Sequence, residues 1–178
     1  MRCVEATLDQ LLADLALHRL DLVLSEQPMP AGIGLRAYNH RLGQSGLSFF
    51  GPRKGAAATR RGFPASLDAA PMLLPSKHSV QRRHIDDWFE AQGIAPEVVG
   101  EFDDSALLKA FGEAGFGYFA APTVIEDEIC RMYRMAVIGR APEARESFFA
   151  ISPERRLKQD AAVAITSMAR EDLFGAAS

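Results

Sequence analysis

Apolar positions near the start of the chain recur with the period of a helix. Four leucines between residues 8 and 15 are spaced i, i+3, i+4 and i+7, which predicts a helix with one buried face. Thr7 is the expected N-cap, and Asp9 falls in the first turn, where the helix dipole favours a carboxylate. The preceding RCVEA reads as the end of a strand, and LDLVLS at 20–25 predicts a buried parallel strand. The chain therefore begins with a predicted strand–helix–strand unit.

From residue 71 onward, short apolar runs alternate with amphipathic stretches. Strands are expected in PMLLP, PEVVGEF, FGYFAAP, YRMAVIG and RESFFAIS, after two extended segments, LRAYNHRL and GLSFFGP. Helices are expected in SVQRRHIDDWFEAQG, SALLKAFGEAG, TVIEDEICRM and DAAVAITSMAREDLF. The segment GPRKGAAATRRGFPASLDAA predicts an exposed connection. This alternation of strands and helices indicates a layered α/β fold with mostly parallel sheets.

Composition narrows the class of protein. The 178 residues are 48% hydrophobic and 24% charged, which suits one ordinary domain or two small lobes. The net charge of -3 lacks the positive excess that a nucleic-acid-binding domain needs. No run approaches the length of a membrane span, and the N-terminus lacks the pattern of a secretion signal. With only Cys3 and Cys130, both expected to be reduced, a cytoplasmic location is expected.

Polar side chains stand where predicted strands give way to helices. Asp103 and Asp104 follow one strand, at the end where ligands gather in open α/β sheets. Helix capping is the alternative role for at least one of them. A catalytic dyad would need a second group of matched chemistry, and a divalent-metal site would need several oxygen ligands. A weak binding site for a monovalent cation remains a further alternative.

Equivalent polar segments follow other predicted strands. In PSKHS at 75–79, Ser76 and Ser79 can cap the next helix while Lys77 and His78 face a ligand or simply solvent. Two further edges of this kind are formed by Glu5, Thr7 and Asp9, and by Ser25 with Glu26. The glycines of GEAGFGYFAAP follow a helix and do not match G-x-G-x-x-G, so they predict a turn and not a nucleotide site. The two basic clusters, Arg82–His84 and Arg60–Arg61, are expected to be solvated.

Several stretches resemble a known family. EATLDQLLADLALHRLDLVLSEQP is similar to the start of the regulatory domain of LysR-type transcriptional regulators, and PMLLP, WFEAQGIAP and GFGYFAAP resemble the second lobe of that domain. GEFDDSALLKAFG looks most like the members that activate sodium/proton antiporter expression. The resemblance covers nearly the whole chain.

The resemblance implies a two-lobed fold of the periplasmic-binding-protein type (type II), with two crossovers near residues 40–48 and 140–149. Lobe I would comprise about 1–43 and 147–178, and lobe II about 44–146. Residues 1–178 would form an N-terminally truncated effector-binding domain, without the winged helix-turn-helix and without the first strand and helix of lobe I. We expect self-association as a dimer or tetramer, contact with promoter DNA only through the missing domain, and no contact with a membrane.

The resemblance also implies an effector site in the cleft between the lobes. By position, the candidates for it are Glu5, Thr7, Asp9, Ser76, Lys77, His78, Ser79, Phe102, Asp103, Pro122 and Thr123. No cofactor, catalytic residue or resident metal is expected. Na+ or Li+ is the implied effector, with Asp9 or Asp103 as a candidate weak Na+ site. The alternative is a solute-binding module that recognises a small organic ligand in the same cleft, and an enzyme using Asp103 and Asp104 is a third hypothesis.

Overall fold

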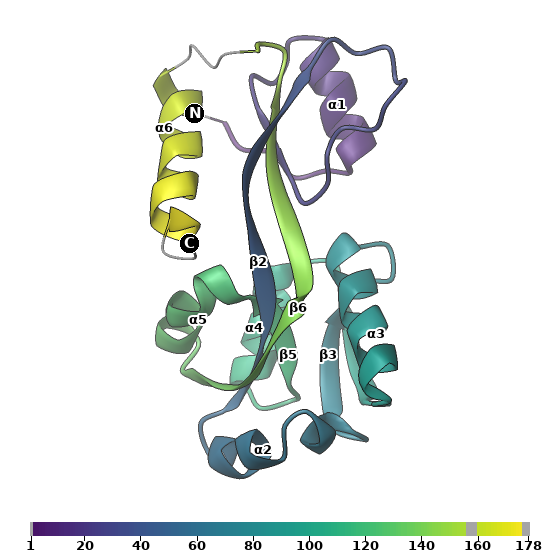
Figure 1. Cartoon of the computed structure of the whole chain (residues 1–178), viewed down its shortest axis with the longest axis vertical. Coiled ribbons are helices and arrows are strands. Elements are labelled where there is room, and N and C mark those ends of the chain that lie inside the picture. The colour runs from purple at the N-terminus through teal and green to yellow at the C-terminus, as the bar shows by residue number, and fades with distance from the viewer. Residues whose placement is uncertain (1, 156–159, 176–178) are drawn as a thin grey trace. The chain divides into compact units, whose positions relative to one another are not determined.

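The computed structural model describes residues 2–155 and 160–175 (Figure 1). The chain divides into two compact units, which we call unit 1 (Met1–Gln44 and Ser147–Ser178) and unit 2 (Ser45–Glu146). Two long strands, β2 (Tyr38–Pro52) and β6 (Met135–Ser152), contribute residues to both units. The sequence predicted two separate extended segments in each place. That prediction is wrong, since each pair of segments is one continuous strand.

Unit 1 has a small core built on its first helix. Its elements are α1 (Leu8–Ala16), β1 (Val23–Ser25), the outer ends of β2 and β6, α6 (Asp160–Met168) and a π-helical segment (Ala169–Leu173). Thr7 caps α1 as predicted: its hydroxyl accepts from the Gln10 N–H at 3.4 Å, and the Gln10 side chain accepts from the Thr7 N–H at 3.2 Å. Leu12 and Leu15 point from α1 onto Val23 and Ile151, so the predicted apolar face is the buried one.

Two strand predictions for unit 1 are wrong. Residues 2–6 form no strand. The 20–25 segment forms only the three-residue strand β1, which pairs antiparallel with β6 through Val23 and Ile151. Leu24 stays 54% exposed, because β1 is an edge strand with only its Val23 side on the core. A continuous apolar run therefore did not mean a strand buried on both faces.

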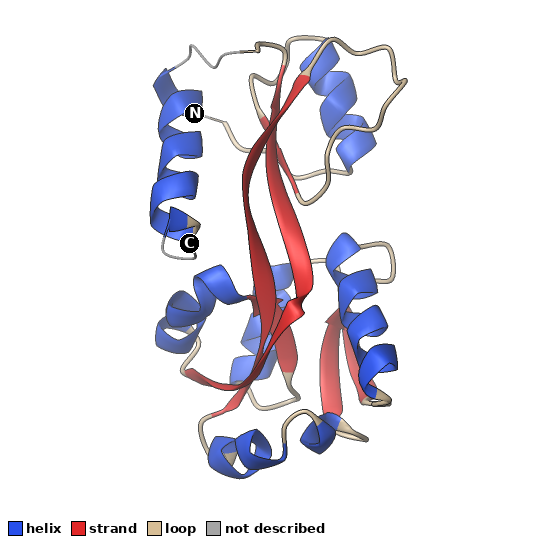
Figure 2. Ribbon diagram, in the orientation of Figure 1, coloured by secondary structure: helices blue, strands red, loops and turns tan. Residues whose placement is uncertain are grey.

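Unit 2 alternates strands and helices as the sequence predicted (Figure 2). Its elements are α2 (Ala56–Gly62), a 3-10 turn at Ala65–Leu67, β3 (Pro71–Pro75), α3 (Val80–Gln92), β4 (Glu97–Phe102), α4 (Ser105–Glu113), β5 (Phe119–Pro122), a 3-10 turn at Thr123–Ile125 and α5 (Glu126–Met132). The expected exposed connection at 51–70 is wrong in part, since Ala56 and Leu67 anchor its two short helical pieces in the core. Gly93 ends α3 in the left-handed conformation, as predicted.

Strand β3 of unit 2 is buried on both faces. Met72 and Leu74 of β3 point into one apolar cluster with Ile85, Trp88 and Phe89 of α3. Leu73, between them, points into the opposite cluster with Leu108 of α4 and Ile129 of α5. Because successive strand residues face opposite sides, a continuous apolar run such as MLL marks a strand covered by helices on both sides.

Strand direction corrects the predicted fold class. The four-stranded sheet has the order β1-β6-β2-β5, with β1 antiparallel to β6 and β5 antiparallel to β2, so it is not the mostly parallel sheet that was predicted. β3 and β4 pair as parallel neighbours, with a parallel bridge from Met72 to Tyr118 beside β5. The alternation rule holds where a helix separates two strands. It fails for β2 and β6, because their partners β5 and β1 are distant in the sequence and run antiparallel to them.

Candidate functional site

The ends of three strands meet at one edge of unit 2. β3 pairs in parallel with β4, with Pro75 opposite Phe102. On its other side the Leu73 N–H donates to the Tyr118 carbonyl at 2.8 Å, so β3 also runs beside β5. Parallel strands bring their carboxyl ends to the same edge. We call this edge, formed by residues 76–79, 103–105 and 123–126, the carboxyl edge.

The segment after β3 is fixed by backbone and capping hydrogen bonds. The Ser76 N–H donates to the Phe102 carbonyl at 2.9 Å, which ties the segment to the end of β4. The Ser79 hydroxyl accepts from the Arg82 N–H at 2.9 Å and caps α3, as the sequence predicted for this serine. Lys77 and His78 are exposed between these two serines. The edge therefore offers a cation and an imidazole on a short loop held at both ends.

The two neighbouring aspartates after β4 have different roles. Asp104 caps α4, since one of its carboxylate oxygens accepts from the N–H groups of Ala106 and Leu107 at 2.7 and 3.2 Å. Asp103 is exposed and is not the cap. The ring of Phe102 packs on Phe111 of α4, with ring centroids 5.1 Å apart. Of the two carboxylates, Asp103 is the one left for a ligand at the carboxyl edge.

Arg82 holds the ends of β3 and β4 in place. Its side chain is only 8% exposed and donates to the Pro75 carbonyl at 2.9 Å and to Glu101 at 3.2 Å. It also pairs with Asp86 one turn along α3 at 2.9 Å. Burial lowers the pKa of Arg82, but the hydrogen bonds to Asp86 and Glu101 more than offset this and the pKa is raised. Arg82 was predicted to be solvated, and this is wrong because the first turn of α3 lies over the strand ends.

A polar network within the core reaches the carboxyl edge after β5. The fully buried Ser48 of β2 donates its hydroxyl proton to Glu126 at 2.8 Å, and its oxygen lies 2.9 Å from the Thr123 hydroxyl oxygen. Arg140 of β6 donates twice to Glu126, at 2.8 and 2.6 Å. Sequence reasoning did not find this network. A lone serine in the apolar run LSFFG was its only local signal, and its partners lie 75 and more residues away.

The charge on Glu126 is stabilised by its partners. Burial raises the pKa of this carboxyl, but the hydrogen bonds from Arg140 and Ser48 outweigh it, so the pKa is lowered from its ordinary value of 4.5. The same contact raises the pKa of Arg140. Glu126 is therefore ionised at neutral pH and can only accept hydrogen bonds.

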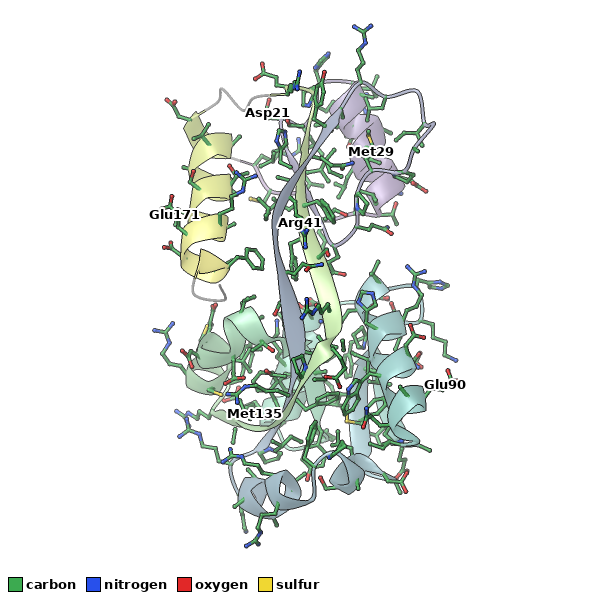
Figure 3. The ribbon with its side chains drawn as sticks, in the orientation of Figure 1. Asp21, Met29, Arg41, Glu90, Met135 and Glu171 are labelled. Atoms are coloured by element: carbon green, nitrogen blue, oxygen red, sulfur yellow. The ribbon has the colours of Figure 1, made fainter. Side chains whose placement is uncertain are left out.

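Pro122 ends β5 in unit 2, and the other predicted site residues lie in unit 1. Glu5, Thr7 and Asp9 are all exposed at the start of α1. A cavity of about 320 Å³ in unit 1 contains none of the predicted effector residues. Its lining is Arg2, Cys3, Val4, Leu11, Arg19, Leu20, Asp21, Leu22, Val23, Leu24, Ala161, Ala162 and Ile165. Asp21, labelled in Figure 3, is one of the few charged members of this largely apolar wall.

Across residues 2–155 and 160–175, no group of three or more His, Cys, Asp or Glu side chains is placed to hold a metal ion. The same residues include no helix of the length and apolar character that a membrane crossing requires. The carboxyl edge instead presents hydroxyls, one free-standing carboxylate and one ammonium group on a rigid sheet.

The sequence as a whole decides the family. The model of the LysR substrate binding domain matches residues 1–173. The chain belongs to the LysR substrate-binding domain family. It is an effector-binding regulatory domain of a LysR-type regulator and not an enzyme.

Relatives of this LysR domain include a transcriptional activator. The chain is 33% identical over 177 residues to the transcriptional activator protein NhaR of Escherichia coli, and equally to that of Shigella flexneri. These matches cover 99% of this chain and 58% of the length of either relative.

Solved structures show that the fold is shared. The regulatory domain of a HypT mutant from Salmonella typhimurium superposes with a TM-score of 0.67 at 22% identity, over 94% of this chain and 82% of that one. The Synechocystis CcmR regulatory domain, solved in complex with 2-PG, gives a TM-score of 0.64 at 11% identity, over 93% and 79%. The chain thus has the α/β fold of LysR regulatory domains, with a different balance of strand directions from the one predicted.

Proposed function

We propose that this domain senses Na+ and controls expression of a sodium/proton antiporter as part of a longer LysR-type activator. The observation that carries the proposal is the joint placement of Ser76–Ser79, Asp103 and Thr123 at the carboxyl edge of unit 2. The 33% identity to NhaR over 99% of the chain supports the assignment to antiporter control. Glu5, Thr7 and Asp9 of unit 1 remain proposed contributors.

The chemistry of the edge suits a cation better than an anion. Asp103 is exposed and does not serve as the cap, so its negative charge is available to a ligand. Hydroxyl and carboxylate oxygens are ligands that hard cations accept. Lys77 is the only lysine or arginine within the three segments that form the edge, so an anionic effector would have little counter-charge there.

In the proposed mechanism, Na+ binding shifts the balance between two arrangements of the domain. A ligand shifts such an equilibrium only through its differential affinity for the two states. Self-association of the domain, as a dimer or tetramer, would pass the change to DNA-binding segments outside this chain. These partners, and a cytoplasmic location, are part of the proposal, and membership of the family supports them.

Calorimetry tests sodium sensing directly. The domain is titrated with NaCl and with KCl at constant ionic strength, and we expect heat from specific binding with NaCl only. Asp103→Asn should weaken the sodium response by about tenfold to a hundredfold, since a charged contact is worth about 1.5 to 3 kcal/mol. Asp104→Asn is the matched control, because Asn caps a helix nearly as well as Asp and should leave binding unchanged. Equal heats for the two salts would contradict sodium sensing.

A small organic effector is the second candidate, because the structurally similar CcmR domain was solved in complex with 2-PG. The same titration, run with 2-PG in place of NaCl, separates the two functions. Saturable binding of 2-PG together with equal heats for NaCl and KCl would favour the organic effector. A sodium-specific heat without binding of 2-PG would favour the cation.

A further inference from the structure

The direction of the hydrogen bonds in the Ser48 network determines what Thr123 can offer a ligand. Arg140 and Ser48 both donate to Glu126, whose charge leaves it able only to accept. A serine hydroxyl has one proton, and that of Ser48 is used on Glu126 at 2.8 Å. The Ser48 oxygen can then only accept from its other partner.

That other partner is Thr123. Its hydroxyl oxygen lies 2.9 Å from the Ser48 oxygen, within hydrogen-bond distance, so Thr123 must be the donor of this bond. The single hydroxyl proton of Thr123 is thereby directed inward, toward the fully buried Ser48. What remains on the Thr123 oxygen for any other partner is a lone pair.

The backbone around Thr123 is fixed as well. The buried Ser45 accepts from the Val124 N–H at 3.2 Å and donates to the Gly46 carbonyl at 2.8 Å. Both serines come from β2, the antiparallel neighbour of β5, so the turn that begins at Thr123 is held against a rigid strand. Thr123 itself is half-buried at the carboxyl edge, one strand away from the segment that begins with Ser76.

We infer that Thr123 is an obligate hydrogen-bond acceptor at the carboxyl edge, so that the effector group it contacts is a cation or an N–H or O–H donor and not an anion. This inference rests on the proposed effector edge but not on sodium itself. Ser48, Glu126 and Arg140 act as positioning residues, because their hydrogen bonds fix the direction of the Thr123 hydroxyl. Membership of the family does not determine the direction of these hydrogen bonds. The CcmR domain, solved in complex with 2-PG, shows that the fold also accommodates that ligand.

Neutron diffraction from a deuterium-exchanged crystal tests the direction of these hydrogen bonds without any effector. We expect the Ser48 deuterium on the line to Glu126 and the Thr123 deuterium on the line to Ser48. A Ser48 deuterium directed at Thr123, or a Thr123 deuterium directed away from Ser48, would overturn the inference. Because no ligand is added, this result stands whether or not the domain responds to sodium.

Binding to three variants tests the consequence, with NaCl as the cation probe and potassium sulfate as the anion probe at constant ionic strength. Thr123→Val keeps the shape but removes the oxygen, and should weaken sodium binding about tenfold. Thr123→Ser keeps the hydroxyl and should bind sodium within twofold of the unchanged domain. Ser48→Ala frees the Thr123 proton to point outward, so sodium binding should weaken while sulfate binding is gained.

The two arms distinguish the failure of this inference from the failure of sodium sensing. If the unchanged domain gives equal heats with NaCl and KCl, sodium sensing fails, and the deuterium positions still decide the polarity of Thr123. If sodium binds but Thr123→Val binds it equally well, the inference is wrong while sodium sensing stands. Sulfate binding to the unchanged domain that Thr123→Val abolishes would also overturn the inference. Thermal melting of each variant checks that it is folded.

Discussion

Among the described residues, unit 2 holds two buried apolar clusters, one on each face of β3, whereas unit 1 holds one smaller cluster. In one of the clusters of unit 2, Phe50, Leu73 and Phe119 are no more than 1% exposed. Both units also leave some large apolar side chains exposed, such as Leu17 at 60% in unit 1 and Phe116 at 62% in unit 2. The cavity of about 320 Å³ also lies in unit 1. Apolar burial is the main stabilising term in folding, so unit 2 should be the more stable unit.

The difference bears on where a binding site can be precise. Functional groups keep their geometry when they sit on elements locked by packing and by further hydrogen bonds. At the carboxyl edge of unit 2, Arg82 and Ser48 provide that support from buried positions. At the start of α1 in unit 1, Glu5 and Asp9 are exposed and only Thr7 takes part in a capping box. The carboxyl edge is therefore the better-formed part of the proposed site.

The largest expected effect comes from opening the core of unit 2. Phe119→Ala should lower the free energy of unfolding by about 4 kcal/mol, because it removes a fully buried ring stacked on Phe50 with ring centroids 5.3 Å apart. Leu15→Ala, the matched truncation in unit 1, should cost about 2 to 3 kcal/mol. Urea denaturation measures both. A larger loss from Leu15→Ala would contradict the ranking of the two units.

Arg82→Met should have the next largest effect, a loss of about 2 kcal/mol, because the Pro75 carbonyl would lose its donor while the apolar stem is kept. Arg83→Met, one position along the same helix at an exposed site, is the control and should change stability by less than about 0.5 kcal/mol. Urea denaturation of the two variants gives the comparison. Equal effects would show that the contacts of Arg82 are not stabilising.

Removing one helix cap from each unit compares the two units directly. Thr7→Ala in unit 1 and Asp104→Ala in unit 2 should each cost about 1 kcal/mol, as loss of an N-cap usually does. Amide hydrogen exchange in the first turns of α1 and α4 measures the local change. Asp104→Asn should keep protection in α4, and its loss in that variant would mean that charge, and not capping, is what Asp104 supplies.

The smallest expected effect concerns acid stability. Because the pKa of Glu126 is lowered in the folded domain, its ionised form stabilises the fold at pH values above its ordinary pKa of 4.5. That contribution is lost as the pH falls from 4.5 through the folded value. Glu126→Gln should thus lower stability by about 0.5 kcal/mol at pH 7, since Arg140 is largely exposed. Urea denaturation at several pH values should show the difference shrinking in acid, and a constant difference would contradict it.

Local signals in the sequence predicted most of the helices and some of their caps, but not α2. The leucine spacing predicted α1, Thr7 was recognised as its cap, and Gly93 as the end of α3. The sequence also selected the residues that the structure brings to the carboxyl edge, because strand-to-helix switches recur at the same side of a parallel sheet. It could not say which of Asp103 and Asp104 caps α4, since both lie within two residues of the helix start.

What the sequence missed depends on contacts between distant segments. Arg82 looks like a solvated helix residue until the end of β3 is placed beneath it, and Ser48 becomes polar support only when Thr123 lies 2.9 Å away. The prediction of strand direction was wrong for the same reason. The partners of β2 and β6 are set by the path of the whole chain and not by the local sequence pattern. These pairings are set by tertiary packing, which periodicity does not encode.

Two-dimensional amide NMR during a sodium titration tests most directly whether the carboxyl edge of unit 2 is the sensing surface. NaCl replaces KCl stepwise at constant ionic strength. Saturable shifts are expected at residues 76–79, 103–107 and 123–126, with smaller changes around the cavity of unit 1. Shifts confined to the residues that line that cavity, or identical spectra in the two salts, would contradict the account.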